Sequence, residues 1–167
     1  MGVIEEVEHS DVQYFSPIFT VPKKDGEYRM VLNLKNLNLD IQYYHFKMET
    51  FETALKLIKL TSYMASIDIR HAYYSVPIAV EHKQFLCFKW KGTFFHYTCL
   101  PNGISCAPRY YTKLLKPVYA TLRQLGHINM GYIDDSLLVA DEKDDCIRKG
   151  RFYYSWQKNL LLYQFKN

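Results

Sequence analysis

Residues 128–140 read I-N-M-G-Y-I-D-D-S-L-L-V-A, and this stretch decides the fold. Two runs of strand-forming residues, 128–133 and 136–140, are separated only by Asp134 and Asp135. Because Asp tolerates left-handed backbone angles, the pattern predicts a tight hairpin with the acidic pair as its two-residue loop. Adjacent carboxylates repel each other unless they are solvated or bind a cation. An ordinary exposed turn and a metal site are therefore the two interpretations.

A third carboxylate, Asp68, stands near the end of the apolar run 63–69. If that run forms a strand beside the hairpin, Asp68 meets Asp134 and Asp135 at one end of a sheet. Such a cluster of oxygen ligands suits Mg²⁺, which takes few carboxylates and completes its shell with water and phosphate oxygens. The resulting hypothesis is that two distant parts of the chain share one site for paired divalent ions.

The rest of the chain alternates short strands and helices, which is an α+β pattern without an internal repeat. Asp25-Gly26 and Lys91-Gly92 stand between strand-like runs and predict two further hairpins. Thr50 is a plausible N-cap, and Gly126 is the stop signal of a long helix. The expected elements are strands 16–22 and 28–32, a helix after Thr50, strands 63–69, 85–90 and 93–99, a helix over about 106–125, and strands 128–133 and 136–140.

The composition is that of a globular protein. The 167 residues are 49% hydrophobic and 23% charged, which excludes disordered, collagen-like and disulfide-scaffold chains. No apolar run approaches the roughly 18 residues that a membrane helix needs, and the acidic start lacks the apolar region of a signal peptide. The four cysteines form no C-x-x-C pair, so we expect reduced thiols in an intracellular protein, cytoplasmic or nuclear. A net charge of +4 permits a polyanionic partner.

Four motifs resemble those of reverse transcriptases. Residues 132–135 (Y-I-D-D) resemble the Y-x-D-D box of that family. Residues 68–77 (D-I-R-H-A-Y-Y-S-V-P) look like its first palm motif, and residues 100–108 (L-P-N-G-I-S-C-A-P) look like its second. Residues 16–38 look like its fingers hairpin. The motifs follow the order and approximate spacing of the family, and the resemblance covers about residues 2–145.

The resemblance implies an α+β palm-and-fingers polymerase fold, in which an antiparallel sheet packs on helices and the thumb is absent. It assigns residues 1–62 and 78–100 approximately to the fingers, and residues 63–77 and 101–145 to the palm. Beyond Asp145 the sequence no longer follows the helix that the family pattern places there. Residues 146–167 are therefore expected to form a divergent tail.

The implied activity is that of an RNA-directed DNA polymerase of a retrotransposon, which adds deoxynucleotides to a primer 3′-hydroxyl by two-metal nucleotidyl transfer. Asp68, Asp134 and Asp135 would be the catalytic carboxylates. Together with the carbonyl of Ile69 they would hold two Mg²⁺ ions, with Mn²⁺ as a substitute. The partners would be an RNA or DNA template with its primer, deoxynucleoside triphosphates and the missing thumb and ribonuclease H regions of a larger polyprotein, without a membrane.

Further residues carry the implied contacts to substrates. Arg29 would grip the triphosphate with its guanidinium fork, and Tyr73 would pack beneath the sugar and collide with a ribose 2′-hydroxyl. Tyr132 and Ile133 would contact the primer and template. The complete set implied to bind the nucleotide is Lys23, Lys24, Arg29, Ala72, Tyr73, Asn102 and Gly103, with the choice between the two lysines left open.

Some features leave alternatives open. His71 and Asn102 depart from the residues that are common at their positions in the family. The stretch 114–132, with L-P-N-G before it, looks most like DIRS-type retroelements, with gypsy-type elements as the runner-up. A truncated, inactive remnant that keeps the fold and binds nucleic acid weakly is the main alternative function. A palm polymerase that works without a template or makes RNA is a third interpretation, and Tyr73 argues against it.

Overall fold

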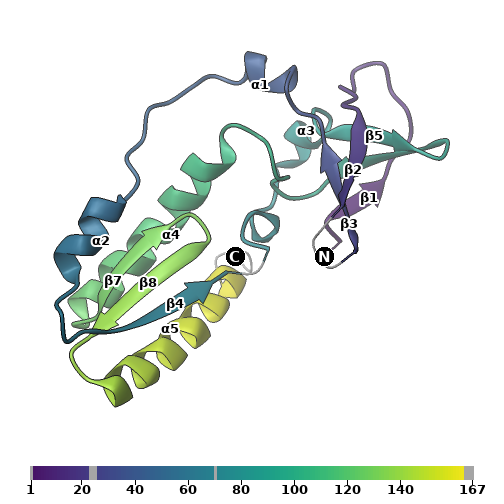
Figure 1. The fold of residues 1–167 in the computed structure, drawn as a ribbon. Helices are drawn as coiled ribbons and strands as arrows, with labels where there is room; N and C mark the ends of the chain where they lie inside the picture. Colours follow the sequence, from purple (N-terminus) through teal and green to yellow (C-terminus); the bar gives the residue numbers. More distant parts are fainter. Residues whose placement is uncertain (1, 23–25, 70, 164–167) are drawn as a thin grey trace. The chain divides into compact units, whose positions relative to one another are not determined.

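The computed structural model of the chain describes residues 2–22, 26–69 and 71–163, the last eight by their backbone alone (Figure 1). They form two compact units. Unit 1 contains the residues up to His45 and Tyr73–Pro108, and unit 2 contains Phe46–Ala72 and the residues from Arg109 on.

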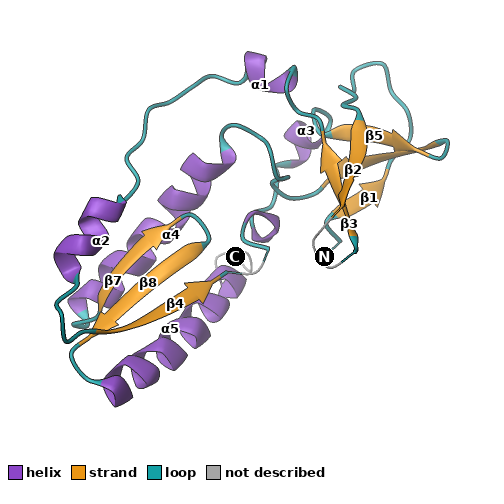
Figure 2. Cartoon of the chain, in the orientation of Figure 1, coloured by secondary structure: helices purple, strands orange, loops and turns teal. Residues whose placement is uncertain are grey.

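The helices and strands mostly follow the predicted order (Figure 2). In chain order they are β1 (Ile4–Glu6), β2 (Ile18–Pro22), β3 (Tyr28–Leu32), α1 (Leu37–Asp40), α2 (Phe51–Leu57), β4 (Tyr63–Asp68), the 3-10 turn η1 (Tyr73–Ser75), α3 (Val80–Lys83), β5 (Cys87–Trp90), β6 (Thr93–Tyr97), α4 (Ala107–Gln124), β7 (Ile128–Tyr132), β8 (Asp135–Ala140) and α5 (Lys143–Tyr163).

Unit 1 contains two antiparallel sheets, β1-β6-β5 and β2-β3. The pairing of β2 with β3 and of β5 with β6 confirms both predicted hairpins, although Asp25 of the first lies outside the described residues. The turn between β5 and β6 consists of Lys91 and Gly92 at φ angles of 48° and 92°. Two successive left-handed residues match the twist of a two-residue hairpin. Unit 1 has an apolar core. Its buried members are Leu32, Leu34, Leu37, Leu86, Phe88, Tyr97, Leu100, Ile104 and Ala107.

The short strand β1 was not expected from the sequence. It pairs with β6, and the register sets Glu5 opposite His96. Oε1 of Glu5 accepts a hydrogen bond from Lys83 Nζ at 2.6 Å and lies 2.7 Å from His96 Nε2. All three residues of β1 are exposed. Charged and backbone hydrogen bonds, and not apolar burial, therefore hold β1. This explains why the sequence of β1 has no apolar pattern.

Unit 2 contains the antiparallel sheet β4-β8-β7. Ile67 of β4 and Ser136 and Leu138 of β8 are buried on the face that the helices cover. Gly150 of α5 approaches the Leu138 side chain, and Tyr119 of α4 contacts Gly131 of β7, so both helices cover the same face of the sheet. No helix in the described part of the chain is long and apolar enough to cross a bilayer.

Helix α5 lies where the sequence predicted a divergent tail. Its Cys146 and Tyr153 side chains are buried, and the Tyr153 ring stacks on Tyr119 with the ring centroids 6.2 Å apart. Helix α5 therefore contributes Cys146 and Tyr153 to the core of unit 2. The four cysteines are free thiols, as expected, and burial raises the pKa of Cys146 above its ordinary value.

Tyr119 and Gly131 form the closest packing contact of unit 2. A Cβ atom on Gly131 would lie 2.1 Å from Cζ of the Tyr119 ring, so position 131 accepts no side chain while the ring is there. The Tyr119 hydroxyl lies 2.8 Å from Oγ of Ser136, which is the cross-strand partner of Gly131. Burial raises the pKa of this hydroxyl, so it stays neutral and able to donate a hydrogen bond.

We expect Gly131→Ala to lower the free energy of unfolding by about 2–3 kcal/mol, because the added methyl group overlaps a buried ring. Gly150→Ala is the matched control, since its nearest neighbours would lie 3.9 Å and 4.0 Å from the new Cβ atom. In the interior of α5 this control should be neutral or stabilising by up to about 1 kcal/mol. Urea denaturation measures both variants, and equal stability of Gly131→Ala and the wild type would disprove the contact.

We expect the docking of β1 to weaken in acid. Hydrogen bonds from His96 and Lys83 lower the pKa of Glu5 from its ordinary value of 4.5. Its stabilising contribution is therefore complete above pH 4.5 and is lost as the pH falls through the lower folded-state pKa. The Thr98 amide, which donates to the Val3 carbonyl at 3.0 Å, reports docking by hydrogen exchange. Glu5→Gln should remove the pH dependence, and an unchanged acid transition in this variant would contradict the assignment.

Candidate active site

The hairpin between β7 and β8 turns at Ile133 and Asp134. Tyr132 pairs with Asp135, so the predicted loop Asp134–Asp135 is wrong by one residue. Asp135 is the first residue of β8, and Ile133 adopts a left-handed φ of 55°. A β-branched residue rarely takes that conformation. The register of the sheet overrides the local preference, because a one-residue slip would turn the buried Ser136 to the opposite face.

Asp68 lies beside the hairpin, as the sequence predicted. The register of β4 and β8 sets Asp68 directly opposite Asp135. Directly opposite residues of an antiparallel pair have Cβ atoms about 4.5–5.5 Å apart and share one face. The amide of Ile69 donates to the carbonyl of Asp134 at 2.9 Å and joins the end of β4 to the tip of the hairpin.

Asp68 and Asp135 lie on the open face of the sheet. Ile67 and Ser136 point toward the helices, so their neighbours Asp68 and Asp135 point the other way. Tyr132 is the cross-strand partner of Asp135 and shares that face, with 45% of its surface exposed. Tyr132, Asp135 and Asp68 therefore form one row across β7, β8 and β4.

The charges at this end of the sheet suit a cation. Asp68, Asp134 and Asp135 are exposed, and no described residue gives any of their carboxylates an ion pair. Carboxylates that gather without a cation repel one another, and oxygen donors are the ligands that Mg²⁺ prefers. Among the described residues no three acidic, His or Cys side chains converge closely enough to hold a metal ion. The fit to a divalent ion therefore rests on donor type and shared position.

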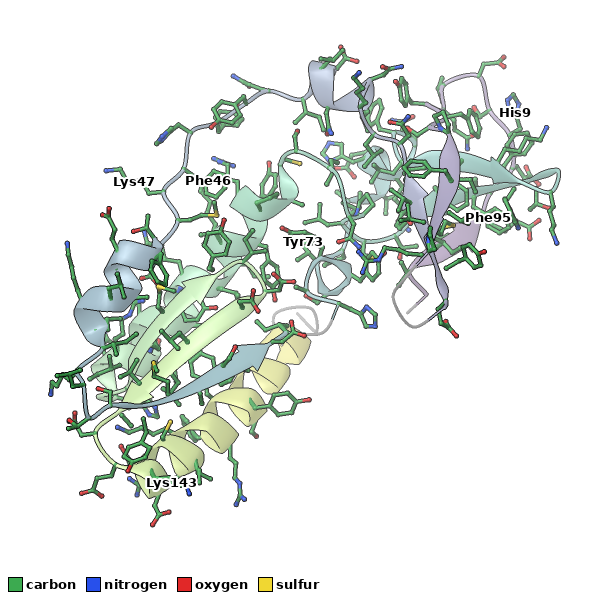
Figure 3. The ribbon with its side chains drawn as sticks, viewed as in Figure 1. His9, Phe46, Lys47, Tyr73, Phe95 and Lys143 are labelled. Atoms are coloured by element: carbon green, nitrogen blue, oxygen red, sulfur yellow. The ribbon has the colours of Figure 1, made fainter. Side chains whose placement is uncertain are left out.

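The other predicted residues lie in unit 1, in unit 2 or outside the described residues. Ala72 is buried in unit 2, and Arg29 is exposed on β3 of unit 1. Tyr73 opens η1 and packs against the core of unit 1 (Figure 3). Lys23 and Lys24 lie outside the described residues.

Asn102 and Gly103 lie in the loop before α4. Nδ2 of Asn102 donates to the Tyr74 hydroxyl at 3.1 Å. Gly103 has a φ of 96°, a conformation that glycine adopts without strain. This loop is held by a residue that sequence reasoning did not assign. The side-chain amide of Asn38 donates to the Gly103 carbonyl at 2.9 Å and accepts from the Ser105 amide at 2.8 Å.

A second residue missed by the sequence is Glu49. Its Oε2 accepts a hydrogen bond from the Gly131 amide at 2.8 Å, and its Oε1 accepts one from Arg123. Glu49 lies just before the helix cap Thr50, where an acidic residue is typical of an exposed helix start. Only the fold shows that this residue contacts the hairpin.

Comparison with known proteins shows the relatives of this chain. The family described as "Reverse transcriptase (RNA-dependent DNA polymerase)" matches residues 21–163. The Pro-Pol polyprotein of simian foamy virus type 1 is 26% identical over 130 residues, which cover 78% of this chain and 11% of that protein. The transposon Tf2-3 polyprotein of Schizosaccharomyces pombe is 25% identical over 146 residues, which cover 87% of this chain and 11% of that protein.

Solved structures show the same fold. The protease–reverse transcriptase of prototype foamy virus, in its CSH mutant form, superposes with a TM-score of 0.76 at 24% identity. The match covers 97% of this chain and 20% of that one. The native form gives a TM-score of 0.73. The chain therefore has the fingers-and-palm arrangement of helices and antiparallel sheets. Because the family match spans residues 21–163 and includes the strand and hairpin that carry the three carboxylates, the chain belongs to the reverse transcriptase family.

Proposed function

We propose that the chain is the fingers and palm of an RNA-directed DNA polymerase of a retrotransposon. It would add deoxynucleotides to a primer 3′-hydroxyl by two-metal nucleotidyl transfer. The observation that supports this most strongly is the register that sets Asp68 opposite Asp135, with Asp134 in the adjoining turn. Residues 1–62 and 78–100 would approximately form the fingers, and residues 63–77 and 101–145 would form the palm.

The proposed roles follow the chemistry of each side chain. Asp68, Asp134 and Asp135 would hold two Mg²⁺ ions, or Mn²⁺ in their place, with the Ile69 carbonyl as an additional ligand. Members of the family generally use divalent metals, which when bound neutralise charge on the attacking hydroxyl and the leaving pyrophosphate. Phosphoryl transfer needs mainly positioning and charge stabilisation, so carboxylates in a fixed register are the essential contribution of this chain.

The family resemblance also implies contacts to the substrates. Arg29, with Lys23 or Lys24, would grip the triphosphate. Tyr73 would pack beneath the deoxyribose and exclude a 2′-hydroxyl. Ala72, Asn102 and Gly103 would complete the nucleotide site, while Tyr132 and Ile133 would contact the primer and template.

The partners would be a template with its primer and deoxynucleoside triphosphates. The chain spans 11% of the length of the curated relatives described above, and those relatives are polyproteins. This supports thumb and ribonuclease H regions as further partners. We propose a DIRS-type element as the source, with a gypsy-type element as the alternative.

Asp134→Asn tests the central assignment. In a polypeptide that includes this chain and a thumb, we expect primer extension with Mg²⁺ or Mn²⁺ to fall by about 100-fold or more, because the variant loses a charged ligand. Chelation of the metal should abolish extension. Asp144→Asn, at an exposed position of α5, is the matched control and should extend normally. Undiminished extension by Asp134→Asn would refute the role, and an inactive wild type would favour the inactive remnant.

Tyr73→Ala tests the sugar gate. Removal of the ring should raise the ratio of ribonucleotide to deoxynucleotide incorporation by about 10-fold or more, because a steric contact with the 2′-hydroxyl is lost. Tyr43→Ala is the control, since the Tyr43 side chain is 78% exposed. Single-nucleotide incorporation kinetics measure the ratio. No gain in ribonucleotide use would count against the gate and would favour an RNA-synthesising polymerase.

A further inference from the structure

The outer strand of the catalytic hairpin is an edge strand. In the order β4-β8-β7, only one side of β7 pairs with another strand of the described residues. The backbone groups on its outer side need partners from outside the sheet. Two of these partners are side chains: Arg123 Nη2 donates to the Asn129 carbonyl at 3.1 Å, and Glu49 Oε2 accepts from the Gly131 amide at 2.8 Å.

The two side chains are themselves an ion pair. Oε1 of Glu49 accepts from Arg123, and 29% of the Glu49 side chain is exposed to solvent. Glu49 stands in the extended segment between Lys47, labelled in Figure 3, and α2, while Arg123 lies in the last turn of α4. One carboxylate therefore joins the segment before α2, helix α4 and strand β7 by charge-assisted bonds.

This support lies close to the carboxylates of the site. Gly131 directly precedes Tyr132, and the turn residues Ile133 and Asp134 follow. On the far side of the hairpin, the Ile69 amide bonds to the Asp134 carbonyl. The tip is thus held from the β4 side by one hydrogen bond and from the outer side by Glu49.

Packing does not replace this bond. A cavity of about 120 Å³ lies next to the hairpin, and Glu49, Thr112, Gly131 and Ile133 are among its lining residues. Oγ1 of Thr112 is buried and has no hydrogen-bond partner among the described residues. Ile133 adopts its left-handed conformation beside this cavity and is only half-buried, so apolar packing around it is incomplete.

We propose that Glu49 is a positioning residue of the catalytic hairpin. Its carboxylate fixes the Gly131 amide and, through the two-residue turn, sets Asp134 and Asp135 relative to Asp68. The effect of Glu49 on catalysis rests on the proposed function. Hydrogen exchange measures the placement of the hairpin independently of that function.

Hydrogen exchange of the 167-residue chain, followed by NMR, tests the placement. In Glu49→Ala, we expect the Gly131 amide to exchange about 10-fold faster, since it loses a bond to a charged acceptor. The Ile69 amide, bonded to Asp134 on the opposite side of the hairpin, should exchange about 3-fold faster. Glu52→Ala, at an exposed position three residues along, is the matched control and should change neither rate.

A conservative variant separates positioning from general loss of stability. Glu49→Gln keeps an oxygen that accepts from Gly131, so the Ile69 rate should return to within about 2-fold of the wild type. Should Glu49→Ala fail to fold, Glu49→Asp, whose shorter side chain loses its reach, takes its place. A faster Gly131 amide with an unchanged Ile69 amide would overturn the proposal. A uniform acceleration of all amides of unit 2 would also overturn it.

Primer extension supplies the second measurement. In Glu49→Ala, we expect the Mg²⁺ concentration for half-maximal rate to rise about 3- to 10-fold, with little change in KM for the nucleotide. If Asp134→Asn abolishes extension while Glu49→Ala keeps the Mg²⁺ dependence of the wild type, the positioning role is wrong. If Asp134→Asn extends normally, the proposed function fails, and the exchange rate of Ile69 still decides the placement.

Discussion

The pairing of β4 with β8 is the constraint on which the candidate site depends. Buried Ile67, Ser136 and Leu138 fix the register from the helix-covered face. A slip of one residue would bring polar Ser66 and charged Asp68 onto that face, where an unpaired carboxylate costs several kcal/mol. The core of unit 2 therefore selects the side of the sheet on which Asp68 and Asp135 meet. Apolar burial on one face thus determines the position of charge on the other.

Polar contacts then refine what apolar packing has selected. Among the described residues no strand pairs with the outer side of β7, and Glu49 and Arg123 supply two hydrogen bonds there. In unit 1 the amide of Asn38 holds the loop of Gly103 and Ser105 in a similar way. Each contact joins segments far apart in the sequence, and each acts next to a residue that the family resemblance assigns to the reaction.

Much of the fold was predictable because its signals are local. Asp25-Gly26 and Lys91-Gly92 stand between alternating runs, and Thr50 caps α2 with its side chain, which accepts from the Thr53 amide. The position of Asp68 was predictable because an apolar strand ends there. The missed elements lack such signals. Strand β1 is held by the charged side chain of Glu5, and α1 is too short for a helical period.

The sequence predicted that Asp68 lies beside the hairpin, and it missed the residues that support the hairpin. The loop prediction at Asp134 and Asp135 followed the backbone preference of Asp, whereas the sheet register places the turn at Ile133 and Asp134. Glu49 carries no sequence signal, because a carboxylate before a helix is ordinarily solvated. Helix α5 was not expected, because the sequence after Asp145 departs from the family pattern. The burial of side chains such as Tyr153 carries no motif that the sequence could show.

The contact between Tyr119 and Gly131 couples two positions that lie twelve residues apart. Because the ring occupies the space of a side chain at 131, neither position can accept every substitution alone. A smaller residue at 119 would open room for Ala or Ser at 131, yet it would also remove the hydroxyl that meets Ser136. The two sites are therefore free to diverge only as a pair, and engineering of the hairpin has to redesign both at once.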